Sequence, residues 1–301
     1  MQISTSTFFR RQSETMSELK TESAQLQQQI STGKKITVPS DDALSFSEIS
    51  VLKSRLSRLE QYERSVESIR QRVSDEEATL SQVSNVIIRL QELVIQGSTD
   101  TNSAADRKVI GQEVSALMET LVSFANTKDF EGGAIFGGYI VEGDAFTRQN
   151  DGTIIYNGDS ARSVQTINDD TQMDVSSPGS DVFMSIRLQN GDVKSLFDIA
   201  KGAADALAAG ESPEASSEEL KSALEHISGF QAISGARLSR LDTQGEILQD
   251  FTLAAKTRLT ILEDTDIEEA ITELKKILMS IDAAQASFVK IADLSLFNYL
   301  K

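Results

Sequence analysis

Apolar residues recur at alternating spacings of three and four along most of this chain, which is the pattern of helices that pack through a narrow seam. In the first segment Ser23 takes one place on this stripe, and Gly33 marks the end of the helix. We therefore predict a helix before Gly33, and its apolar positions are Ile3, Phe8, Phe9, Met16, Leu19, Leu26 and Ile30.

A second helix is expected to start after a loop at 34–39. Ser40 is a predicted N-cap, and Asp41 and Asp42 would lie in the first turn, where the helix dipole favours anions. Because these residue types are common at helix starts, we interpret the two carboxylates as capping groups and not as a metal or acid–base site.

The helix that follows is expected to be long. Residues 43–96 contain no Pro or Gly and keep the three–four spacing, with one phase slip at 66–69. At 1.5 Å per residue they make a rod of roughly 80 Å, which indicates an elongated bundle. Gly97 ends the rod, and Ser103 with Asp106 resembles a capping box. The next helix should fold back on the rod through Ile110, Val114, Leu117, Leu121 and Phe124.

The composition changes near residue 130. Nine of the seventeen glycines lie at 132–191, where short β-prone runs alternate with turn signals. Asp151-Gly152 introduces one run, and Asn157-Gly158 is a hairpin signal. We predict a small inserted β domain whose strands are Ala134–Tyr139, Thr153–Tyr156, Ser163–Ile167 and Val182–Ile186.

Helical spacing returns near Leu196, and a second long helix begins after Pro213. Gln231, Ser234 and Thr252 fall on the seam of this helix and are expected to weaken it. Asp264–Asp266 then marks a break before the last helix. Its apolar positions include Leu278, Ile281, Phe288, Ile291, Leu294, Leu296, Phe297, Tyr299 and Leu300.

The fold class predicted from this order is mainly α: an elongated coiled-coil-like helical bundle with paired terminal helices and a small inserted β domain. We expect three domains. Residues 1–40 and 266–301 form a terminal helical domain, 41–130 and 194–265 form a long-helix rod, and 131–193 form the surface-facing β insert.

Composition narrows the classes of function. Apolar residues make up 39% of the chain, aromatic residues only 6%, and the formal net charge is -17. Such an acidic chain repels nucleic acid and anionic lipid, so neither is expected as a partner. The absence of Cys excludes disulfides and thiolate chemistry. No signal-peptide core and no membrane-spanning run is found, which leaves specialised export open.

Catalytic motifs find no support in the sequence. His226 is the single histidine and lies in a helical pattern, where a surface residue is a far more common interpretation than a general base. His and Cys metal sites, a phosphate-binding loop and a dinucleotide fingerprint do not occur. We expect no enzyme activity, no metal and no cofactor.

The two ends carry apolar stripes but no nearby globular core. Because an isolated helix pair is marginally stable in water, we predict that 1–40 and 266–301 are mobile in the monomer and become ordered on assembly. The apolar positions named above for the first and last helices are the expected assembly contacts. An alternative is that both ends pack on the long helices of their own chain.

Several motifs resemble the bacterial flagellin family. The first is Leu26–Lys35, which includes Gly33, followed by Pro39, Ser40, Asp41 and Asp42. The others are Leu90–Leu93 with Asn102, Asp106-Arg107 and Ala125–Thr127, and the ending Ala283–Leu300. Within the family, Phe136–Tyr139, Phe146, Tyr156–Ser160 and Ser177–Phe183 resemble the insert of the hook-associated junction proteins. Ala43 departs from the proline that this branch often carries.

The resemblance implies a structural adaptor of the bacterial flagellum at the hook–filament junction, arranged as a ring of identical subunits. The implied partners are hook-associated protein 1 on the hook side, flagellin on the filament side and a cytoplasmic export chaperone. It also implies an extracellular location reached through the flagellar type III apparatus without a cleaved signal peptide. A flagellin-like filament subunit and a cytosolic coiled-coil scaffold remain alternatives.

Overall fold

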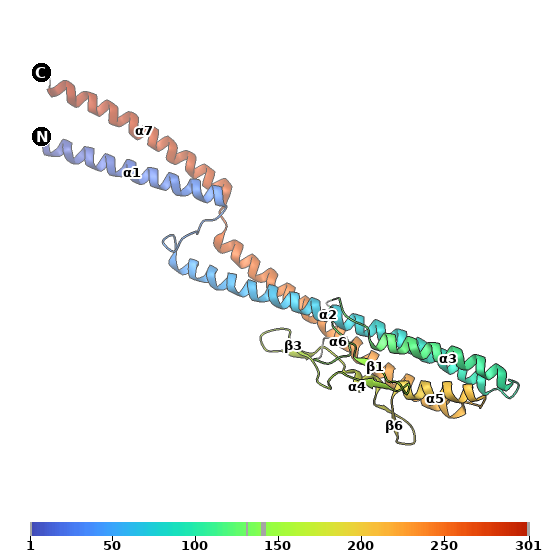
Figure 1. Cartoon of the computed structure of the whole chain (residues 1–301). Helices are drawn as coiled ribbons and strands as arrows, with labels where there is room; N and C mark the ends of the chain where they lie inside the picture. The colour runs from blue at the N-terminus through green and yellow to red at the C-terminus, as the bar shows by residue number, and fades with distance from the viewer. Residues whose placement is uncertain (1, 131, 140–142, 300–301) are drawn as a thin grey trace. The chain divides into compact units, whose positions relative to one another are not determined.

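The structure is a computed structural model of the 301-residue chain (Figure 1). It describes residues 2–130, 132–139 and 143–299, with the side-chain surroundings of 2–6, 8 and 291–299 left out. The described residues form two compact units. One unit comprises residues 1–58 and 251–301, and the other comprises residues 59–250.

The first unit contains the two terminal helices, α1 (Gln2–Thr32) and α7 (Ile267–Tyr299), which run side by side (Figure 1). It also contains the start of α2 (Ala43–Ser98) and the end of α6 (Glu214–Glu263). The helix end predicted at Gly33 is confirmed, because α1 ends at Thr32 and Gly33 has the left-handed φ of 71° that favours glycine.

The second unit is built on the remaining parts of α2 and α6 together with α3 (Ala104–Ala125) and α5 (Leu196–Ala209). Ser103 accepts from the Asp106 amide while the Asp106 carboxylate accepts from the Ser103 amide, so the predicted capping box is present. Helices α3 and α5 approach closely at Gly111, where an added Cβ would lie 3.2 Å from the Ala208 backbone nitrogen. All four helices contribute to one apolar core, which includes Leu80, Ile87, Val114, Leu121, Phe197, Leu207, Leu220 and Ile227.

The insert between α3 and α5 contains short antiparallel strand pairs. Strand β1 (Phe146–Arg148) pairs with β2 (Ile154–Tyr156), and β3 (Val164–Thr166) pairs with β4 (Gln172–Asp174). A third pair joins β5 (Ile186–Arg187) to β6 (Val193–Lys194). Between β4 and β5 lies the short helix α4 (Gly179–Phe183). The predicted mainly α fold with a small β insert is confirmed.

Three details of the predicted insert are wrong. The β1–β2 turn is Asp151-Gly152, with Gly152 at φ 82°, and Asn157-Gly158 follows β2 without closing a hairpin. Val182 lies in α4 and not in a strand, because the turn after Pro178 starts a helix that buries Val182. The segment 134–139 forms turns with a single bridge from Lys128 to Ala134. Among the described helices, none is both long and apolar enough to cross a membrane.

Candidate assembly surfaces

The α1–α7 pair buries one face of each terminal helix. On α7 the buried positions are Ala270, Ile277 and Ile281, and on α1 the small residue Ser23 is buried. Phe9 of α1 and Phe288 of α7 meet edge to face, with ring centroids 5.3 Å apart. Of the other α1 positions predicted from the sequence, Met16, Leu19, Leu26 and Ile30 are all half-buried.

A second apolar stripe on α7 remains open to solvent. Leu278 is 42% exposed, and four further apolar side chains are exposed by 38–63%: Ile267, Ile271, Met279 and Val289. The predicted contacts on α7 therefore fall into two groups: Ile281 is buried against α1, whereas Leu278 is exposed to solvent. For Ile3, Phe8, Ile291, Leu294, Leu296, Phe297 and Tyr299 the structure describes the helical backbone only, and Leu300 lies outside the described residues.

The connection after α1 and the connection after α6 are joined by backbone hydrogen bonds. The Lys35 amide donates to the Glu263 carbonyl at 2.8 Å, and the Thr265 amide donates to the Gly33 carbonyl at 2.9 Å. Lys34 and Asp264 form an antiparallel bridge between them. The predicted loop at 34–39 therefore serves as a joint between two segments that are far apart in the sequence.

Glu263 is the charged centre of this joint. Its side chain is 6% exposed and forms ion pairs of 2.7 Å with both Lys34 and Lys53. Burial acts to raise the pKa of Glu263, but the hydrogen bonds from the two lysines outweigh it and hold the pKa below its ordinary value. Sequence patterns gave no sign of this role, because Glu263 and Lys53 are separated by 210 residues.

The family motif at 39–42 caps α2 differently from the prediction. Asp42, and not Ser40, accepts from the Leu44 and Ser45 amides, because the helix begins at Ala43. Asp41 accepts instead from the amides of Thr37 and Val38 and closes the turn at Pro39. These hydrogen bonds lower the pKa of both carboxyl groups, with the Thr37 amide the main cause for Asp41 and the Ser45 hydroxyl for Asp42.

A buried carboxylate anchors the insert to the long helices. Glu76 of α2 is fully buried and accepts from the Ser177 hydroxyl at 2.8 Å and from the Ser234 hydroxyl of α6 at 2.9 Å. Arg237 of α6 lies 3.3 Å from the same carboxylate and also donates to Ser177 at 2.9 Å. The Glu76 carboxylate thus joins α2, the insert and α6. The three–four spacing of the long helices gave no indication of these partners.

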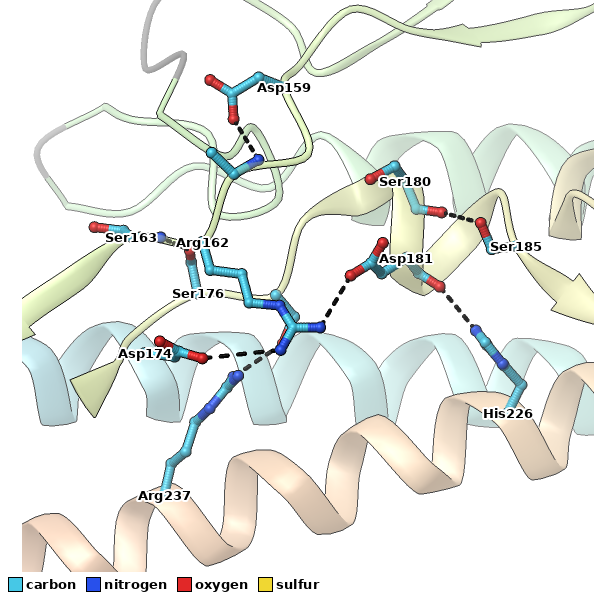
Figure 2. A network of polar contacts seen from close by, with 12 residues as sticks. Asp159, Arg162, Ser163, Asp174, Ser176, Ser180, Asp181, Ser185, His226 and Arg237 are labelled. Atoms are coloured by element: carbon cyan, nitrogen blue, oxygen red, sulfur yellow. Dashed lines mark hydrogen bonds and ion pairs between the residues drawn. The ribbon is translucent and has the colours of Figure 1, made fainter.

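His226 and Tyr156 both take part in packing and hydrogen bonds to backbone carbonyls. Nε2 of His226 lies 2.9 Å from the carbonyl oxygen of Asp181 (Figure 2). The His226 ring also packs on the ring of Phe230. Within the described ranges, no group of three or more acidic, His or Cys side chains is placed to hold a metal ion. Tyr156 is held by hydrogen bonds to the carbonyls of Phe136 and Asp159, and burial raises its pKa to about 12.

Comparison with known proteins identifies the helical frame. Residues 3–140 match the bacterial flagellin N-terminal helical region. Flagellar hook-associated protein 3 of Salmonella typhimurium is 27% identical over 99% of this chain and 99% of its own length. The Escherichia coli protein of the same name is also 27% identical, over 91% of this chain and 92% of its own length.

The chain resembles the flagellar hook-associated proteins over its whole length. The resemblance predicted from the sequence is thereby confirmed. By contrast, polar flagellin F of Vibrio parahaemolyticus is 28% identical over 38% of this chain. Another flagellin, that of Listeria innocua, is 22% identical over 84% of this chain and 82% of its own length.

Solved structures of hook-associated proteins share the fold. Hook-associated protein 3 of Legionella pneumophila superposes with a TM-score of 0.66 at 20% identity, covering 71% of this chain and 98% of that one. A second Legionella pneumophila structure, described as the flagellar junction protein FlgL, gives a TM-score of 0.60 at 18% identity and covers 72% and 99%. This chain therefore shares its fold with these solved structures over about seven tenths of its length.

Proposed function

We propose that the chain is an adaptor at the hook–filament junction, linking hook-associated protein 1 on the hook side to flagellin on the filament side. The observation that carries the proposal is the match to hook-associated protein 3 of Salmonella typhimurium over 99% of both chains. A filament subunit is the second candidate, and it is favoured less because the flagellin of Listeria innocua, which matches over 84% of this chain, is only 22% identical.

The terminal helices are the proposed assembly elements. One face of α7 is covered by α1, while Leu278 and its exposed neighbours remain available to other subunits. An exposed apolar stripe of this kind is costly for a chain that stays alone in water and is typical of a surface covered on assembly. The residues predicted from the sequence for both ends, from Ile3 to Ile30 and from Leu278 to Leu300, remain proposed contacts.

The proposed location is extracellular, at the junction, with export through the flagellar type III apparatus. A cytoplasmic chaperone would guard the C-terminal helix before export, because its apolar stripe promotes premature association. The role is structural and not enzymatic. Relatives named as hook-associated proteins and flagellins support this, and no substrate or cofactor is proposed.

A deletion strain tests the adaptor role. We expect hooks to form and flagellin to appear in the medium without polymerising, and we expect the intact gene to restore filaments. Normal filaments in the deletion strain would defeat the proposal. Purified chain that polymerises alone into long filaments would favour the filament-subunit role instead.

A paired substitution in the tail tests the assembly contacts. Phe297→Asp together with Leu300→Asp should leave the helical content of the chain unchanged and abolish filament attachment, because the charges would have to be buried without partners. Ser295→Asp, two residues from Phe297, is the matched control, since it adds charge without removing an apolar side chain. Wild-type motility in the paired variant would remove the tail from the proposed interface.

A further inference from the structure

A basic hollow lies between the insert and α6. It has a volume of about 530 Å³, and its charged lining consists of Arg162 from the insert, Arg237 and Arg240 from α6, and the single carboxylate of Asp174. Ile233 and Ala236 give it an apolar wall. Figure 2 shows Arg162 reaching from the insert towards α6, with Asp174 and Arg237 beside its guanidinium. Three guanidinium groups thus share one small surface of a chain that is strongly acidic as a whole.

The three arginines differ in how far they are already neutralised. Arg162 pairs with Asp181 at 3.3 Å and with Asp174 at 3.8 Å, so it is balanced within the insert. Arg237 forms an ion pair of 3.3 Å with the buried carboxylate of Glu76. Arg240 is exposed and makes no ion pair within the part of the chain that the structure describes. The hollow therefore has a free cation at its edge.

An acidic groove lies further along the same helix, about two and a half turns from Arg237 to Glu246. It also has a volume of about 530 Å³ and is lined by four carboxylates, Glu63 and Glu67 from α2 and Asp242 and Glu246 from α6, against the one guanidinium of Arg70. Arg70 pairs with Glu67 at 3.1 Å and with Asp242 at 3.3 Å. Glu246 is exposed and has no ion-pair partner among the described residues.

The two charged surfaces lie on opposite flanks of α6. At 3.6 residues per turn, the positions of Ile233, Arg237 and Arg240 are centred about 180° from those of Asp242, Glu246 and Gln249. The positions of Leu241 and Leu248 fall between the two sets, and both side chains are buried in the seam shared with α2. The second unit therefore has a basic flank and an acidic flank.

We propose that the basic flank around Arg240 binds the acidic flank around Glu246 of a second copy of this chain. Two chains with a net charge of -17 repel one another, so lateral association needs a local match of opposite charges. Opposite flanks of opposite sign favour a head-to-tail contact, which is the kind that can close a ring, because each subunit then contacts its two neighbours through different surfaces. This inference rests on the proposed junction role, for which the family resemblance implies a ring of identical subunits, and it names the contact between those subunits.

Charge reversal tests the contact in cells that lack the native gene. Arg240→Glu or Glu246→Arg alone should lower the amount of chain retained on isolated hook ends by at least about 10-fold, because each places like charges together. The double variant R240E/E246R should recover retention to within about 3-fold, because the pair is restored with its signs exchanged. Lys221→Glu, an exposed reversal elsewhere on α6, is the control and should retain the chain normally. A double variant no better than either single variant would overturn the proposal.

Cross-linking separates this proposal from the junction role itself. Since the chain contains no Cys, Arg240→Cys with Glu246→Cys introduces the only two thiols. A short bismaleimide applied to isolated hook ends should give a ladder of dimers and larger species, whereas either single Cys variant should stay monomeric. Chain present on hook ends without a ladder, or dimers from one single variant, would overturn the head-to-tail contact and leave the junction role intact. Absence of the wild-type chain from hook ends would overturn the junction role and this inference with it.

Discussion

Replacing Glu76 with Ala should release the insert from the long helices. The carboxylate is 1% exposed and accepts from Ser177 and Ser234, with Arg237 at 3.3 Å. Its removal leaves two buried hydroxyl groups without their acceptor and leaves a guanidinium that is only 12% exposed without its counter-ion.

The expected cost is at the lower end of the range for a broken buried ion pair. Removing one partner of such a pair costs about 3–5 kcal/mol. Arg237 keeps its hydrogen bond to Ser177 and some access to water, so we expect about 3 kcal/mol. Since 1.4 kcal/mol corresponds to a factor of ten, opening of the insert should become roughly 100-fold more frequent.

Amide hydrogen exchange measures this opening at the strands themselves. The Val175 amide donates to the Ser163 carbonyl at 2.8 Å and reports whether the segment next to Ser177 stays folded. Glu67→Ala on the same helix is the control, because Glu67 is 67% exposed and its pair with Arg70 contributes only about 0.5 kcal/mol. Exchange of Val175 that changes by less than about 3-fold in the Glu76 variant would refute the anchoring argument. So would a Glu76→Ala and Arg237→Ala pair whose effects simply add.

Three further predictions concern other parts of the fold. Because the pKa of Tyr156 is raised to about 12, the stability that its hydroxyl contributes is present below pH 10 and is lost as the pH rises through 12. A tyrosinate absorbance titration should show one of the four tyrosines ionising late, and Tyr156→Phe should remove that late step and lower the unfolding free energy by about 1–2 kcal/mol. Because the pKa of Glu263 is lowered, its ion pairs stabilise the joint above the ordinary pKa of 4.5, and this stabilisation is lost as the pH falls through the lower pKa of the folded state. Protection of the Lys35 amide from hydrogen exchange should show the same pH dependence. A Glu263→Gln variant with unchanged protection and unchanged pH dependence would contradict this prediction. Gly179→Ala should lower the unfolding free energy by about 1–3 kcal/mol in thermal unfolding, because the added Cβ would lie 2.6 Å from the buried ring of Phe146. The control Gly202→Ala should not destabilise the chain, because its added Cβ has no neighbour within 4 Å.

The helices could be predicted from the sequence because their signal is long and redundant. The three–four spacing repeats over dozens of residues, so single departures such as Glu76 do not hide it. The C-terminal end of α1 and the N-terminal start of α3 were also predictable, because the Gly33 signal and the Ser103–Asp106 capping box depend only on residues that are close in the sequence. The start of α2 was displaced by two residues, because Ser40 and Asp42 are both good N-caps and only the backbone conformation chooses between them.

The insert was less predictable because its strands have only two or three residues each. Such strands carry too few positions to define an alternation, and their pairing depends on contacts with distant segments. Val182 and Phe183 illustrate this: they are β-prone by composition, yet α4 buries both in the core shared with the helices. For the candidate assembly residues, the periodicity predicts an apolar stripe on each terminal helix. It does not determine whether α1 or another subunit covers the stripe on α7.

The polar residues on the long seam have a role that composition alone hides. Ser234 and Gln231 were expected to weaken the packing of α6, yet Ser234 donates to Glu76 and Gln231 accepts from the Ser84 hydroxyl at 3.1 Å. An apolar seam of uniform spacing permits neighbouring registers at similar energy, because each shift replaces one aliphatic contact with another. A buried polar pair has its partner in one register only, and any slip would leave both groups unsatisfied. The insert depends on this register, since Ser177 binds where α2 and α6 present Glu76 and Arg237 side by side. The basic and acidic flanks of α6 depend on it as well, because Arg162, Glu63 and Glu67 complete them from other segments.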